Sequence, residues 1–172
     1  MRTVIAFIIW LILATTANAA ERAVTSNDAK TLYARFAKME GKWKARSTRG
    51  WTETNTYEVA AKGSVVFNRS FFEDEPNDGM LTTFFLDGDR LLLTHYCEAR
   101  NQPTLIASSI DEDANRVVFR YLGGTNMKSR DSGHMDSAVF QFVDDDHVRS
   151  RWSWYGNGQE RWFEDIEQVR VK

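Results

Sequence analysis

Residues 79–98 read GMLTTFFLDGDRLLLTHYCE. Two runs rich in leucine, threonine and aromatic residues flank the dipeptide Asp87-Gly88. Such runs favour extended backbone, and Asp-Gly readily adopts the positive φ angles of a tight hairpin turn. We therefore interpret 79–86 and 89–98 as two antiparallel strands of one hairpin.

The same alternation of strand-like runs and turn residues continues from Gly41 to the C-terminus. Further turns are indicated by Lys62-Gly63, by Asp144–Asp146 and by Gly156–Gly158. Little helical periodicity interrupts the pattern, which predicts about ten strands. The predicted strands are 42–49, 53–61, 64–73, 79–86, 89–98, 103–110, 115–122, 134–143, 146–155 and 159–171.

Sequential strands joined by tight turns form an antiparallel meander, whose two outer strands would be exposed edges. Closing the meander into a barrel pairs those edges with each other. No second helix is expected that could cover a parallel crossover. We therefore predict an all-β, up-and-down barrel of about ten strands, with a two-sheet sandwich as the alternative. The longer polar connection 123–133 would lie at a barrel mouth.

The N-terminus has the three parts of a secretory signal peptide. Arg2 precedes the apolar run Val4–Ala14, and Ala17-Asn18-Ala19 supplies small residues for cleavage. The apolar run is too short to cross a bilayer, and no cysteine lies near the cleavage site to carry a lipid. We expect residues 1–19 to be removed, leaving an exported periplasmic or secreted protein without a stable membrane anchor.

The rest of the chain is expected to be one domain. The segment 20–27 is short and polar and is predicted to be flexible. A single barrel domain is predicted at 28–172. One helix is predicted at about 28–39, capped by Ser26, Asn27 or Asp28, because Leu32, Phe36 and Met39 would share one face.

Charge and cysteine content exclude some classes of function. The formal net charge of −2 gives no sign of the basic face that nucleic acid requires. Cys97 is the sole cysteine, so no internal disulfide can form. We expect a buried thiol, with a pocket-lining thiol or an intermolecular disulfide as alternatives.

Two sets of residues resemble known families. Met39-Glu40-Gly41-Lys42-Trp43 contains a Gly-x-Trp at the first strand, which resembles the opening motif of the lipocalin and fatty-acid-binding superfamily, the calycins. The resemblance implies that Trp43 packs structurally across the closed end of the barrel. A second set resembles a family of uncharacterised exported bacterial proteins described as lipocalin-like barrels, which implies the fold and no activity. This set comprises 86–91, 93–97, 101–103, 133–135 and 144–147.

Strand alternation predicts which side chains point into the barrel. In three strands the inward faces would carry histidine, cysteine and aromatic side chains, with Arg149, Arg151 and Tyr155 facing out. Such an interior suits a small-molecule pocket. The predicted pocket residues are Leu93, His95, Cys97, His134, Phe140, Trp152 and Trp154.

Three functions fit this interior. The leading hypothesis is a binding protein, not an enzyme, that holds a lipophilic or amphipathic small molecule, with His95 and His134 supplying polar specificity. The second is a haem- or metal-dependent enzyme or sensor that uses His95 or His134, although no complete metal ligand set and no catalytic motif can be assigned. The third is a protein-interaction module that uses the outer surface. The cofactor and the oligomeric state are not specified by any motif.

Overall fold

The computed structural model describes residues 21–74 and 79–172. The predicted signal peptide, residues 1–19, lies outside the described residues. Within these residues lie one α-helix, one short 3-10 helix and eleven strands. They are β1 (Arg22–Ala23), α1 (Ser26–Ala37), β2 (Gly41–Ser47), β3 (Thr52–Ala60), η1 (Ala61–Gly63), β4 (Val65–Phe72), β5 (Gly79–Asp87), β6 (Arg90–Tyr96), β7 (Gln102–Asp111), β8 (Arg116–Thr125), β9 (His134–Phe142), β10 (His147–Gly156) and β11 (Gln159–Arg170).

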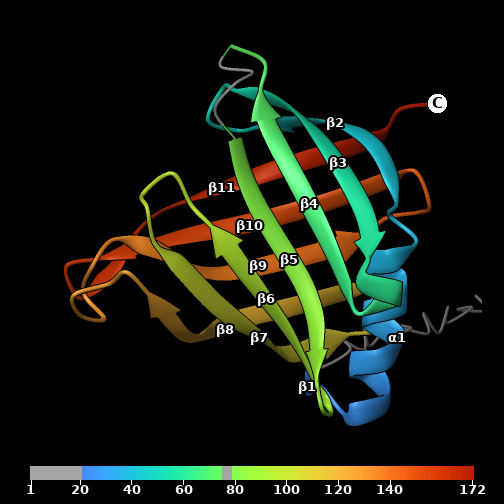
Figure 1. Cartoon of the computed structure of the whole chain (residues 1–172), viewed down its shortest axis with the longest axis horizontal. Coiled ribbons are helices and arrows are strands. Elements are labelled where there is room, and N and C mark those ends of the chain that lie inside the picture. The colour runs from blue at the N-terminus through green and yellow to red at the C-terminus, as the bar shows by residue number, and fades with distance from the viewer. Residues whose placement is uncertain (1–20, 75–78) are drawn as a thin grey trace, which may run out of the picture.

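The ten long strands form a closed antiparallel barrel (Figure 1). Each strand from β2 to β11 pairs with the next in sequence, and β11 then pairs with β2. The predicted up-and-down barrel of ten strands with one N-terminal helix is confirmed, and closure rules out the open sandwich. Closure leaves neither β2 nor β11 as a free edge.

The eleventh strand, β1, lies within the segment that was expected to be flexible. Arg22 and Ala23 pair with Ile110 and Ser109 of β7. That part of β7 lies beyond the three residue pairs that join it to β6. β1 therefore covers backbone groups of β7 that β6 does not reach.

Helix α1 begins and ends two residues earlier than predicted. Thr25, and none of the three expected residues, is the N-cap: its side chain accepts a hydrogen bond from the Asp28 N–H, and the Asp28 carboxylate accepts one from the Thr25 N–H. This reciprocal capping box fixes the helix start at Ser26. Arg22 also pairs with Asp28 and lowers the pKa of that carboxyl well below its ordinary value.

The helix lies across one end of the barrel, at the right of Figure 1. Phe36 inserts its fully buried ring among four phenylalanines, with ring centroids 4.1–6.0 Å away. These are Phe84, Phe119, Phe140 and Phe142. Such an aromatic cluster buries much apolar area and closes this end of the interior. No helix in the described ranges is long and apolar enough to cross a membrane.

Trp43 and Arg170 pack against each other at this closed end. They are opposite each other in the β2–β11 ladder, and the Arg170 guanidinium lies 4.3 Å from the centroid of the buried Trp43 ring. The Trp43 indole N–H donates to the Met39 carbonyl at 2.8 Å. Arg170 also donates to backbone carbonyls of Lys38, Glu40 and Asp145, so it ties the last strand to the helix end and to the β9–β10 turn.

Arg170→Lys is expected to lower the free energy of unfolding by about 2 kcal/mol, because lysine keeps the charge but loses the planar stacking and the forked hydrogen bonds. Urea denaturation measures the change. Arg149→Lys is the matched control, since Arg149 pairs with the exposed Glu167 and is expected to change stability by less than about 0.5 kcal/mol. Equal effects of the two substitutions would contradict the assigned role of Arg170.

Candidate functional site

The barrel interior holds a small cavity beyond the aromatic cluster. Its volume is about 50 Å³, enough for a few water molecules and far below the roughly 300–1,000 Å³ of pockets for drug-sized ligands. The polar lining residues are Glu53, Asn68, Ser70, Thr82, His95, Glu164 and Gln168. The apolar and aromatic lining residues are Trp51, Tyr57, Met80, Phe84, Met135, Phe140, Trp152 and Ile166. Side chains therefore fill most of the barrel, and polar and apolar side chains together line the space that remains.

Strand alternation places the polar side chains inside. In β3, Glu53, Asn55 and Tyr57 are buried while their neighbours are more exposed. In β11, Glu164 and Gln168 share the buried face with Ile166. Sequence reasoning missed these polar residues. The signal was available, since the alternation set by Tyr57 in one strand and Ile166 in the other assigns the carboxylates to the inner face.

A relay of side-chain amides leads to the Glu53 carboxylate. The Asn68 amide donates to the Asn55 carbonyl oxygen at 2.8 Å, and the Asn55 amide donates to Glu53 Oε1 at 2.7 Å. An amide NH2 group can only donate, so both donations run toward Glu53. The buried Oδ1 of Asn68 is left without a hydrogen-bond partner among the described residues.

Two carboxyl groups of the cavity have raised pKa values. Burial raises the pKa of Glu53 from 4.5 to about 7, and the nearby Glu164 adds to the rise, whereas hydrogen bonds from Asn55 and Ser70 oppose it. Burial also raises the pKa of Glu164, which accepts a hydrogen bond from Ser47 Oγ at 2.8 Å. Desolvation disfavours the ionised form of each group, and the second negative charge increases the penalty.

His95 supplies a second unpartnered group. Its Nδ1 lies 2.9 Å from Thr82 Oγ1, and its ring packs on Trp152 with centroids 5.2 Å apart. Its side chain is buried, which lowers the pKa of the imidazole to about 4, so the ring is neutral at physiological pH. Its Nε2 has no partner in the part of the chain that the structure describes.

The other predicted pocket residues have different places. Phe140 and Trp152 line the cavity with His95, and Leu93 is fully buried without lining it. Trp154 stacks in parallel on Trp162 with ring centroids 5.6 Å apart and does not line the cavity. Cys97 follows the end of β6 in the β6–β7 turn, where its N–H donates to the Asn101 carbonyl. Partial burial raises the pKa of its thiol.

The prediction that His134 points into the cavity is wrong. The β9–β10 ladder passes from Ser153–Ser137 to Trp154–Met135, so Asp136 forms a bulge that reverses the alternation. Met135 therefore lines the cavity, and the adjacent His134 points to the opposite side.

His134 is nevertheless fully buried. Its Nε2 lies 2.7 Å from Arg130, whose guanidinium lies between the rings of Tyr121 and Tyr155 at 4.3 and 4.0 Å from their centroids. Asp136 pairs with the same guanidinium. These contacts attach the β8–β9 loop to the barrel wall. None of the contacts that the structure describes for His134 is with Cys97.

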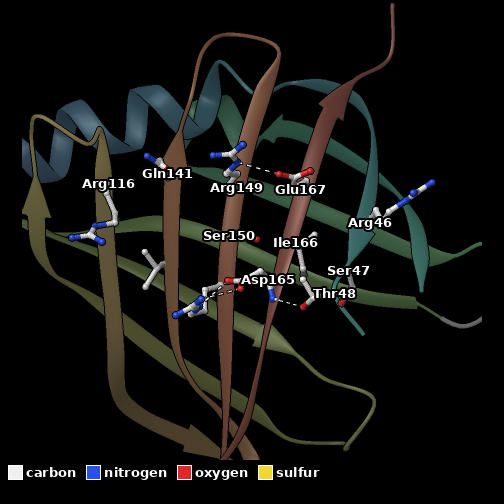
Figure 2. A pocket seen from close by; sticks show the side chains of 12 residues that line it. Arg46, Ser47, Thr48, Arg116, Gln141, Arg149, Ser150, Asp165, Ile166 and Glu167 are labelled. Carbon is white, nitrogen blue, oxygen red and sulfur yellow. Dashed lines mark hydrogen bonds and ion pairs between the residues drawn. The ribbon is translucent and has the colours of Figure 1, made fainter. Parts of the chain in front are cut away.

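A wider hollow of about 520 Å³ lies on the outer wall over β10 and β11 (Figure 2). Two of the arginines that line it pair with carboxylates of the same lining: Arg149 pairs with Glu167 at 3.2 Å, and Arg151 pairs with Asp165 at 2.7 Å. Within 21–74 and 79–172, no group of three or more His, Cys, Asp or Glu side chains is arranged to hold a metal ion. The interior cavity is the candidate site, because it brings together two buried carboxyl groups and a buried imidazole.

Glu53 and His95 make opposite contributions to the pH dependence of stability. Between pH 4.5 and about 7, Glu53 keeps its proton in the folded protein and loses it in the unfolded chain, so stability falls as pH rises. Between pH 6.5 and about 4, His95 stays neutral when folded and is protonated when unfolded, so stability falls as pH falls.

Glu53→Gln is expected to remove the pH dependence that Glu53 contributes. The free energy of unfolding of this variant should therefore rise by roughly 3 kcal/mol relative to that of the wild type as the pH rises from 5 to 8. Urea denaturation of both proteins at each pH unit measures this difference. Glu167→Gln, on the outer wall of β11, is the control. Its free energy of unfolding should differ from that of the wild type by the same amount at every pH. A constant difference for Glu53→Gln as well would show that Glu53 has an ordinary pKa.

No protein-family model matches this chain, and no curated protein matches its sequence. Among solved structures, it is similar to a protein of unknown function from the DUF3598 family of Nostoc punctiforme, with a TM-score of 0.50 and 13% identity. The match covers 92% of this chain and 54% of that protein, so this chain spans about half of its length. At this identity the likeness shows the barrel fold and no activity.

Proposed function

We propose that this protein binds a small polar molecule, or the polar head of an amphipathic one, in the interior cavity of the barrel. The observation that carries the proposal is the pair of buried, unpartnered polar atoms among the lining residues, His95 Nε2 and Asn68 Oδ1. Buried polar atoms are nearly always hydrogen-bonded to protein or to water, so each exception calls for a partner from outside the chain or another explanation. A ligand that bonds to both atoms would remove their desolvation penalty, which is about 1–3 kcal/mol for each.

The cavity volume restricts the size of the ligand that was expected from the sequence. A space of about 50 Å³ is too small for a haem or for a wholly enclosed lipid. It suits a head group of a few heavy atoms, with any apolar part directed toward the half-buried Trp51. The proposal therefore keeps the amphipathic ligand and adds buried polar groups to the apolar interior that the sequence predicted.

Export belongs to the same proposal. The signal-like N-terminus would place the barrel in the periplasm or outside the cell, where a soluble binding protein meets small polar solutes. Binding is favoured over nucleophilic catalysis, because the Cys97 thiol and the His134 imidazole, which could together act as a nucleophile and its base, both lie outside the cavity lining.

Native mass spectrometry of the protein, purified without unfolding, tests the proposal. The expected spectrum shows the mature chain with an additional small mass. His95→Phe should lose that mass, because phenylalanine fills the space without a ring nitrogen, whereas His147→Phe at the exposed start of β10 should retain it. A bare wild-type chain, or equal retention by the His95→Phe protein, would contradict the proposal.

A further inference from the structure

We propose that the ligand's head group is a cation, specifically an organic ammonium. This inference rests on the proposed function and goes further, because it names the chemical class that the interior cavity would select. Three independent properties of the cavity lead to it: the sign of its charges, the direction of its hydrogen bonds and the nature of its rings.

The charges of the cavity have one sign. Glu53 and Glu164 both line it, and none of the described lining residues is lysine or arginine. The remaining titratable groups are Tyr57, whose hydroxyl donates to Gln168, and the neutral His95. Arg49 lies over the Trp162 ring and acts on Glu164 from outside the lining. A cation in the cavity would supply the counter-charge that none of the described lining residues supplies.

Two unpartnered atoms of the cavity lining can accept hydrogen bonds, Asn68 Oδ1 and His95 Nε2. The amide relay ends in the free acceptor Asn68 Oδ1, because both of its donations run toward Glu53. His95 Nε2 is an acceptor when the ring proton lies on Nδ1 and is donated to Thr82. An ammonium group carries up to three donors and no acceptor, so it matches this set of groups.

The cavity walls add aromatic surfaces. Trp51, Tyr57 and Trp152 all line it. Aromatic faces attract cations, by about 2 kcal/mol where water is excluded. An ammonium head also fits a cavity of about 50 Å³.

Three probes with the same chain length separate the head groups: n-butylammonium, butan-1-ol and butanoate. Tryptophan fluorescence titration of the full mature protein at pH 8 measures the affinity for each probe. We expect n-butylammonium to bind roughly tenfold or more tightly than butan-1-ol, and butanoate not to bind.

Variants connect the selectivity to the two carboxylates. Glu53→Gln and Glu164→Gln should each weaken n-butylammonium binding by roughly tenfold while keeping the weaker binding of butan-1-ol. Glu167→Gln, on the same strand as Glu164 but on the outer wall, is the matched control and should bind like wild type. The unchanged butan-1-ol affinity shows that the cavity remains folded and open in each variant.

Binding of n-butylammonium should also weaken by roughly tenfold between pH 8 and pH 5.5, because protonation removes the charge of the carboxylates. Failure of n-butylammonium to bind, equal or tighter binding of either other probe, or wild-type affinity in the Glu53→Gln protein would overturn the inference. A ligand without a basic nitrogen in the native mass spectrum would also overturn it and would leave the proposed function standing.

Discussion

The barrel depends on the five residue pairs that join β2 to β11, from Trp43 opposite Arg170 to Ser47 opposite Ile166. This ladder converts a ten-strand meander with two open edges into a ring. At its closed end it brings Arg170 onto Trp43 and the helix terminus. Toward the mouth it brings Ser47 within hydrogen-bonding distance of Glu164. The same closure therefore holds the fold together and fixes the position of Glu164, one carboxylate of the candidate site.

The interior is divided into two regions with different physical roles. Near the helix, Phe36 and its aromatic neighbours fill the space and contribute the apolar burial that a domain without disulfides needs. Beyond them, β3, β4 and β11 direct carboxylates and amides inward, and buried charge is unfavourable for folding. Conflict between local chemistry and burial is typical of functional sites. The apolar burial of the aromatic region offsets the unfavourable free energy of burying these polar groups. Because the polar groups do not stabilise the fold themselves, we assign ligand binding to them.

The sequence predicted the strands well because turn residues such as Asp87-Gly88 locate the hairpins and because pairing neighbours leaves few topologies. It also placed His95, Phe140 and Trp152 correctly on inner faces that line the cavity. The prediction failed at His134, because the bulge at Asp136 reverses the alternation and no turn residue in the sequence indicates that bulge.

The carboxylates Glu53 and Glu164 were missed for a different reason. A charged residue in an alternating strand normally faces water, so composition favours the outer face. Their burial follows from tertiary closure, which surrounds the inner faces of β3 and β11 with other strands. Only the parity of Tyr57 and Ile166 within the two strands indicated it.

The central claim is that the barrel encloses an acidic cavity that receives a cation. Carbon-13 NMR of the glutamate carboxyl groups tests it most directly, with the Glu53 signal assigned by its absence from the Glu53→Gln protein. We predict that this carboxyl titrates near pH 7 in the free protein and at lower pH once n-butylammonium is bound, because a bound cation stabilises the ionised form. A Glu53 carboxyl that titrates near pH 4.5, with or without n-butylammonium, would contradict the account.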